Sequence, residues 1–126
     1  MGLNRASALI VTGVNSLQNG LLALTTAMPQ LEVVDEAGDA SMALRIVDEH
    51  RPDLVLLDAD LPGNQAWAVL KHIKAGCPHT HCIVLADDVQ QQKEAETLGA
   101  DAVVLKGTPP AKLVAAIEGL LPRPEA

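Results

Sequence analysis

Aromatic side chains are almost absent from this chain of 126 residues, which has no Tyr, no Phe and a single Trp, Trp67. Its core must therefore be aliphatic, and the hydrophobic residues, 48% of the chain, are enough to build one. The same shortage leaves few side chains that could stack on a flavin. The length suits one domain.

Basic residues are also scarce: nine Lys and Arg stand against 16 Asp and Glu, for a net charge of −7. Phosphate binding needs clustered Lys and Arg, so we expect this domain not to bind nucleic acid itself. No apolar run approaches the length of a membrane span, and the two cysteines, with no signal peptide, do not indicate an oxidising compartment. We therefore expect a cytoplasmic protein without membrane contacts.

Short apolar segments alternate with amphipathic ones along the whole chain. This alternation predicts an α/β fold, (βα)5, with a parallel, doubly wound sheet and right-handed crossovers. The expected strands are residues 8–11, 31–35, 54–58, 82–86 and 102–105, and the expected helices are 16–28, 39–51, 64–75, 89–98 and 109–121.

Several helix ends carry recognisable signals. Ser16, Asn64 and Thr108 are expected N-caps, because their side-chain oxygens can accept bonds from free backbone N–H groups. Pro109 is expected at the first position of the last helix, and Gly99 just beyond the end of the fourth.

The most informative segment is residues 52–63, PDLVLLDADLPG, in which an unbroken apolar run ends in Asp58. Such a run is typical of a strand buried on both faces of a parallel sheet. In these sheets ligands bind beyond the carboxyl ends of the strands, so chemistry is expected at Asp58. A nucleotide-binding loop is not indicated, because residues 12–16 contain one glycine and no lysine.

From about residue 8 to 121 the chain resembles the receiver domain of response regulators, closest to the NarL/FixJ/LuxR-type branch. The resemblance rests on ordered segments: ALIV (8–11), GL (20–21), LEVV (31–34), EAGD (36–39), RPDLVLLD (51–58), LPG (61–63), LGAD (98–101) and LK (105–106) followed by TPP (108–110). It implies a CheY-like fold with strand order 2-1-3-4-5 and no enzymatic activity of its own. It also implies a homodimer, a histidine kinase partner, and DNA contact only through a separate C-terminal domain.

The resemblance places the receiver domain at residues 8–121, so a short segment remains at each end of the chain. Residues 1–7 are expected to be an N-terminal extension or the remnant of a tag. Residues 122–126, PRPEA, are expected to begin a linker to a C-terminal helix-turn-helix domain.

Two of the site positions implied by the family are present in this sequence. Asp58 matches the phosphoacceptor, and Lys106 matches the lysine that pairs with the phosphoryl group. As an alternative to a reactive role, the two side chains could form a structural ion pair, since a buried carboxylate needs a partner.

Four other positions depart from the family pattern. The pair of acids that holds Mg²⁺ falls on Thr12 and Gly13, the switch Ser or Thr on Ala86, and the switch aromatic on Val103. Mg²⁺ would be left with the Asp58 carboxylate and a backbone carbonyl from Asp60, so it should bind weakly if at all, and no cofactor is expected. We therefore expect regulation through protein–protein contacts without phosphorylation.

Two alternatives remain open at this point. Asp58 could still be phosphorylated by a histidine kinase with Mg²⁺ if Asp87 or Asp88 supplied the missing carboxylate, although an Asp before a helix usually caps it. More remotely, the chain could be an unrelated flavodoxin-like ligand-binding domain.

Three further sets of residues have an ordinary structural interpretation. Cys77, His79, His81 and Cys82, with His72 nearby, crowd one loop without the spaced pairs of a zinc site, so ordinary loop residues are favoured. For Trp67 we favour packing over a role as an interface anchor. Residues 90–94, QQQKE, are expected to form a solvated helix face, with a partner contact as the alternative that the family resemblance implies.

Overall fold

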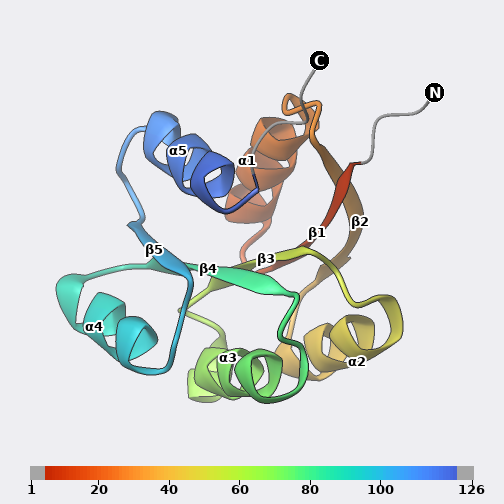
Figure 1. Ribbon diagram of the computed structural model, residues 1–126. Helices are drawn as coiled ribbons and strands as arrows, with labels where there is room; N and C mark the ends of the chain where they lie inside the picture. Colours follow the sequence, from red (N-terminus) through yellow and green to blue (C-terminus); the bar gives the residue numbers. More distant parts are fainter. Residues whose placement is uncertain (1–4, 122–126) are drawn as a thin grey trace.

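The computed structural model describes residues 5–121, which form a five-stranded, entirely parallel sheet (Figure 1). The strands are β1 (Ala6–Val11), β2 (Leu31–Ala37), β3 (Leu54–Asp58), β4 (His81–Ala86) and β5 (Ala102–Leu105). They lie in the order β2-β1-β3-β4-β5, which confirms the predicted α/β fold and its strand order.

Five α-helices cover the two faces of the sheet. They are α1 (Asn15–Thr26), α2 (Ala40–His50), α3 (Gln65–Gly76), α4 (Val89–Thr97) and α5 (Pro110–Leu120), and a short 3₁₀ turn, η1 (Pro62–Asn64), precedes α3. In Figure 1, α1 and α5 lie above the sheet and α2, α3 and α4 lie below it. The fold is thus three-layered, with the strands' carboxyl ends forming one edge.

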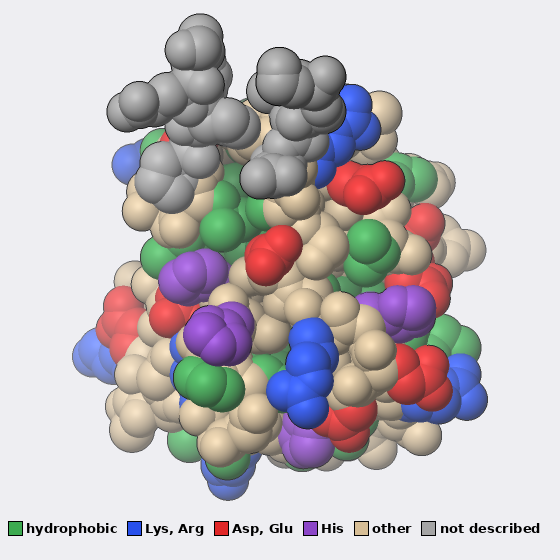
Figure 2. Space-filling view, turned by 45° about the vertical axis from the view of Figure 1, so that its right-hand side comes forward, with side chains coloured by type: hydrophobic (Ala, Val, Ile, Leu, Met, Phe, Trp, Pro, Cys, Tyr) green, Lys and Arg blue, Asp and Glu red, His purple; other side chains and the backbone are tan. Residues whose placement is uncertain are grey.

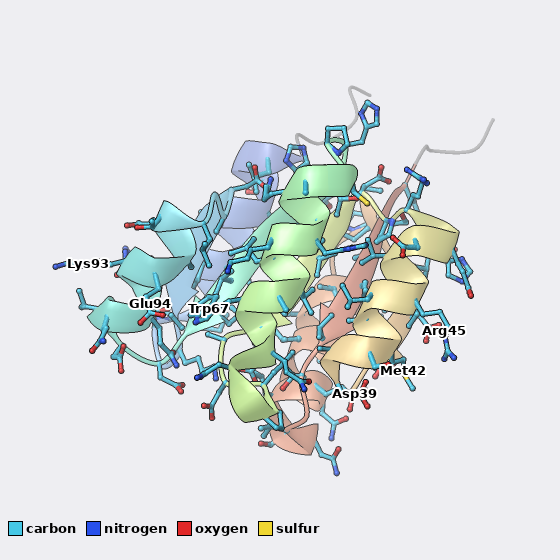
Figure 3. All side chains as sticks on the ribbon, turned by 90° about the horizontal axis from the view of Figure 1, so that it is seen from below. Asp39, Met42, Arg45, Trp67, Lys93 and Glu94 are labelled. Atoms are coloured by element: carbon cyan, nitrogen blue, oxygen red, sulfur yellow. The ribbon has the colours of Figure 1, made fainter. Side chains whose placement is uncertain are left out.

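The core is aliphatic, as the composition requires. Every residue of β3 is buried, because α1 and α5 cover one face of the sheet and α2 and α3 the other. Trp67 is half-buried against the layer below the sheet, on the side of α3 that faces α4 (Figure 3). Its packing role is confirmed.

The first strand begins at Ala6, two residues earlier than expected. The backbone N–H of Ser7 donates to the carboxylate of Asp53 over 2.8 Å, and the N–H of Asp53 donates to the carbonyl of Ser7 over 2.9 Å. These bonds from the start of β3 hold the strand in the sheet. Residues 1–4 of the expected extension, and the expected linker at 122–126, lie outside the described residues.

None of the three predicted N-caps makes the expected side-chain bond. α1 begins at Asn15, so Ser16 lies inside its first turn and Val14 is the N-cap residue without a side-chain bond. Asn64 does occupy the N-cap position of α3, but in a left-handed conformation (φ 59°) and without a capping hydrogen bond from its side chain. The tight turn of η1 sets this backbone geometry.

The last helix starts one residue later than predicted, at Pro110. Pro109 is extended (ψ 146°) because a residue that precedes proline avoids helical angles. Thr108 therefore does not cap α5, and its hydroxyl donates instead to the carbonyl of Leu105 over 2.7 Å.

Other helix signals around α4 are confirmed. Asp88 is the N-cap of α4, and its carboxylate accepts a backbone N–H over 2.8 Å. Asp39, which was not among the expected N-caps, caps α2 in the same way. Gly99 follows α4 with φ +94°, the left-handed geometry expected of a residue after a helix. On α4, Lys93 and Glu94 are exposed, as expected of its solvated face (Figure 3).

We expect Gly99→Ala to lower the free energy of unfolding by about 1 kcal/mol or more, because a side chain is strained at this φ. The added Cβ itself would make only ordinary contacts with Lys74. Urea unfolding followed by circular dichroism measures the change. Gly38→Ala is the matched control, since its Cβ meets nothing within 4 Å and its φ is not positive. Equal stabilities for the two variants would contradict the interpretation.

The sequence contains no apolar run as long as a membrane span, and the helices of the structure can be compared with this expectation. Across residues 5–121, the structure contains no helix that is both long and apolar enough to cross a membrane.

Candidate functional site

The candidate site lies at the edge formed by the carboxyl ends of the strands. Asp58 is the last residue of β3, Thr12 follows β1 directly, and Lys106 follows β5 directly. Parallel strands bring these three positions to one edge although they are 46 and 48 residues apart in sequence. The site is therefore built by the sheet and not by one loop.

Both carboxylate oxygens of Asp58 are engaged within the chain. The hydroxyl of Thr12 donates to Oδ2 over 2.7 Å. The backbone N–H of Asp60 donates to Oδ1 over 2.9 Å, and the Lys106 ammonium contacts the same oxygen at 2.5 Å. Because the Asp58 side chain is only 1% exposed, these contacts take the place of water. The predicted Asp58–Lys106 pair is thus observed.

Lys106 joins two carboxylates. Its Nζ also lies 3.1 Å from Oδ1 of Asp87, whose side chain is 44% exposed. Burial is the largest influence on the pKa of Lys106 and lowers it. The hydrogen bonds and charges of Asp58 and Asp87 together outweigh burial, so the pKa is raised above the ordinary 10.5. Lys106 is therefore a firmly charged cation at neutral pH.

The two acids after β4 have different positions. Asp88 caps α4 by accepting the N–H of Gln91, as expected. Asp87 instead faces Lys106, and its own backbone N–H donates to the Gln91 side chain over 2.7 Å. Of the two acids, Asp87 is the one next to Asp58's partner.

The remaining departures from the family pattern also lie around this edge. Gly13 follows Thr12 and is exposed, and an added Cβ there would lie 3.3 Å from the carbonyl of Gly38. Ala86 ends β4 and is fully buried, with no hydroxyl to offer. Val103 lies in β5 and packs, half-buried, against the layer below the sheet.

The oxygen donors at this edge do not fit a Mg²⁺ ion. Mg²⁺ prefers several oxygen ligands in octahedral geometry and gives up its water reluctantly. The buried Asp58 offers one carboxylate, and both of its oxygens already accept bonds from Thr12, Asp60 and Lys106. In the part of the chain that the structure describes, no group of three or more His, Cys, Asp or Glu is placed to hold a metal ion.

The cysteines do not form a metal site with the nearby histidines. Cys77 and Cys82 are both buried free thiols. Burial is the main cause that raises the pKa of Cys82 to about 12, with Lys74 lowering it and Asp101 raising it to a smaller extent. Cys82 is therefore a neutral core residue, and His72 pairs with Asp48 of α2 at 2.7 Å. The two thiols thus lie in the core, and His72 has a carboxylate partner.

Sequence reasoning missed one member of the site network. Thr12 was identified only as a position where an acid is missing, whereas its hydroxyl contacts Asp58 directly and also accepts the N–H of Val14 over 3.1 Å. Its place, immediately after the buried run of β1, was the available signal, because a polar side chain there has to face the same edge as Asp58.

Comparison with known proteins agrees with this architecture. The family model of the response regulator receiver domain matches residues 9–118. YhcZ, a transcriptional regulatory protein of Bacillus subtilis, is 35% identical over 100 residues, which cover 78% of this chain and 47% of that protein. The nitrate/nitrite response regulator protein NarL of Escherichia coli is 25% identical over 114 residues, which cover 89% of this chain and 53% of NarL.

A solved structure supports the same assignment. The crystal structure of a LuxR-family two-component response regulator from Aurantimonas superposes with a TM-score of 0.85 at 30% identity, over 93% of this chain and 85% of that one. The chain spans about half the length of the curated relatives it matches. The alternative of an unrelated flavodoxin-like ligand-binding domain is therefore set aside. With the family match, the strand order and these relatives in agreement, the chain belongs to the response regulator receiver domain family, among relatives of the NarL and LuxR type.

Proposed function

We propose that this receiver domain regulates a LuxR-type transcription regulator through protein–protein contacts, independently of phosphorylation at Asp58. In this proposal the domain has no enzymatic activity of its own and works in the cytoplasm. DNA is contacted by a separate C-terminal domain. The length of the relatives, about twice that of this chain, supports a further domain.

One observation carries the proposal: a neutral hydroxyl, that of Thr12, donates to Asp58 where the family has a metal-binding acid. Phosphoryl transfer to a carboxylate depends on a metal that neutralises and positions the incoming group. Here Asp58 is buried and satisfied by Thr12, Asp60 and Lys106. An incoming phosphoryl donor would have to displace these bonds without metal assistance.

This chain also lacks the two side chains that respond to phosphorylation in the family. A phosphoryl group pulls in a hydroxyl at the end of β4, but Ala86 has none. The aromatic that then swings inward would stand at Val103, which is aliphatic. We therefore place the output in surface contacts that exist without a modification, including a homodimer.

We expect no phosphoryl adduct on the wild-type protein after incubation with acetyl phosphate and Mg²⁺, measured by intact-mass spectrometry. The reason is the absence of a metal site beside Asp58. Asp58→Ala is the matched control for the acceptor, and a receiver with the intact acidic pair is the positive control for the reagent. An adduct on the wild type that is lost in Asp58→Ala would overturn the proposal.

A second candidate function is that of a phosphorylated receiver served by a histidine kinase. The contact of Asp87 with Lys106 favours it, because Asp87 is a half-exposed carboxylate close to Asp58's partner. In that case Asp87→Asn should abolish the adduct that the wild type forms. The same mass measurement thus separates the two functions.

A further inference from the structure

A groove of about 560 Å³ lies between α1 and the start of α5, the two helices above the sheet in Figure 1. Its volume falls within the range of small-molecule sites, about 300–1,000 Å³. Residues from Ser16 to Ala27 line it on the α1 side, which is a length of roughly 17 Å along the helix. The groove is therefore long enough for an elongated molecule to lie beside α1.

The lining of this groove is mainly apolar. It includes the buried side chains of Leu21 on α1, Leu85 on β4 and Leu113 on α5. Gly20 lines it from the exposed side of α1, and a side chain added there would meet nothing within 4 Å. Apolar walls around open space favour a ligand with a hydrocarbon body, which loses contact with water when it binds.

The charge of the groove is of one sign. Of the described residues that line it, Lys106 alone is charged at neutral pH. The face shown in Figure 2, by contrast, carries acidic, basic and His side chains spread over it, which is ordinary for a solvated surface. In a chain of net charge −7, a groove whose one charge is a cation is complementary to an anion.

The ammonium of Lys106 has a donor to spare. An ammonium carries three N–H groups, and the contacts with Asp58 and Asp87 account for two of them. A ligand carboxylate could accept the third, or replace Asp87, whose side chain is 44% exposed. Ser16 lies in the first turn of α1 and lines the same groove, so its hydroxyl is a further donor on that side.

We infer that this groove binds a free fatty acid of medium length, with its carboxylate at Lys106 and its chain along α1. The inference deepens the proposed function and rests on it in one respect, that no phosphoryl group occupies Lys106. A bound acid would contact the same ammonium that holds Asp58 and would cover the surface between α1 and α5. Through these contacts it would supply the control that a phosphoryl group supplies in the family.

The test is isothermal titration calorimetry of the chain with sodium decanoate, at concentrations below those at which decanoate forms micelles. One molecule should bind per chain, with a Kd at or below about 100 μM. Hexanoate is shorter by four CH₂ groups and should bind at least roughly tenfold more weakly, because less hydrocarbon is buried. Decanol has the same chain without the charge and should bind at least roughly fivefold more weakly.

Gly20→Leu should weaken the binding of decanoate at least roughly tenfold, because the new side chain occupies the groove. The fold should persist, since the added Cβ meets nothing within 4 Å and leucine is a better helix former than glycine. Circular dichroism checks this. Gly119→Leu is the matched control: Gly119 is an exposed glycine of α5 outside the groove, its added Cβ also meets nothing within 4 Å, and the variant should bind decanoate like the wild type.

Three results would overturn the inference. The wild type does not bind decanoate, Gly20→Leu binds it as tightly as Gly119→Leu does, or decanol binds as tightly as decanoate. A groove filled instead by a second copy of the chain would give the first result, together with twice the mass of 13.2 kDa in sedimentation equilibrium. None of these results bears on the mass test at Asp58, so failure of the inference and failure of the proposed function are distinguishable.

Discussion

Replacing Lys106 by methionine should lower the free energy of unfolding at pH 7 by about 3 kcal/mol, as expected when one partner of a buried ion pair is removed. Methionine retains the length of the side chain but leaves the Asp58 carboxylate, 1% exposed, without its cation. The hydrogen bonds from Thr12 and Asp60 remain, so the loss stays at the lower end of the range for such pairs. Urea unfolding of both proteins measures the difference.

The dependence of this loss on pH follows from the direction of the pKa shift. The pKa of Lys106 is raised in the folded state, so its stabilising contribution is complete below the ordinary pKa of 10.5 and is lost as pH rises through the higher folded value. The difference between wild type and Lys106→Met should therefore be constant from about pH 7 to 9 and shrink above 10.5. Lys93→Met, at an exposed lysine on α4, is the control and should leave stability unchanged. A Lys106→Met protein as stable as this control would contradict the prediction.

Replacing Thr12 by aspartate should make the stability of the protein depend on Mg²⁺. The new carboxylate would face Asp58 at a position where a hydroxyl now donates over 2.7 Å. Without metal, the loss of that bond and the like-charge repulsion should lower the free energy of unfolding by about 3 kcal/mol. Two adjacent carboxylates and the edge of the sheet then offer the oxygen ligands that Mg²⁺ needs.

The measurement is thermal unfolding in EDTA and in millimolar Mg²⁺. Thr12→Asp should be stabilised by Mg²⁺, because an ion that binds the folded state raises the midpoint, whereas the wild type should not respond. Thr12→Val is the matched control: it also removes the hydroxyl from Asp58, at a cost of about 1–3 kcal/mol, but it adds no ligand and should not respond to Mg²⁺. Equal responses of wild type and Thr12→Asp would show that the native site already binds the metal.

Much of the fold could be predicted because each strand appears in the sequence as a short run of apolar residues. Residues 54–58 and 102–105 were expected as strands with the bounds that the structure shows. The Asp88 cap before α4 could also be predicted, since a cap acts within three residues. Local errors arose where two signals competed, as at Thr108, where the proline pair moved the start of α5 by one residue.

The candidate site could be predicted only in part, for a different reason. Asp58 was found because it ends an unbroken apolar run, which the structure shows to be a buried strand. Lys106 was found because it matches the lysine of the family pattern. The hydroxyl of Thr12 was counted as a missing acid, since no sequence signal says that it donates to a carboxylate 46 residues away. In the same way, Asp87 and Asp88 are neighbours of one chemical type, and only their orientations distinguish a partner of Lys106 from a helix cap.

The amino-acid sequence by itself determined the alternation of strands and helices, the aliphatic core, the acidic surface and the absence of the metal-binding acids. These properties depend on residue type and on spacing along the chain. Only the tertiary structure decided that Thr12 and Lys106 contact the carboxylate of Asp58, and that α1 and the start of α5 line one groove. Such features depend on the distance between segments far apart in the chain, which is set by the packing of the whole sheet and its helices.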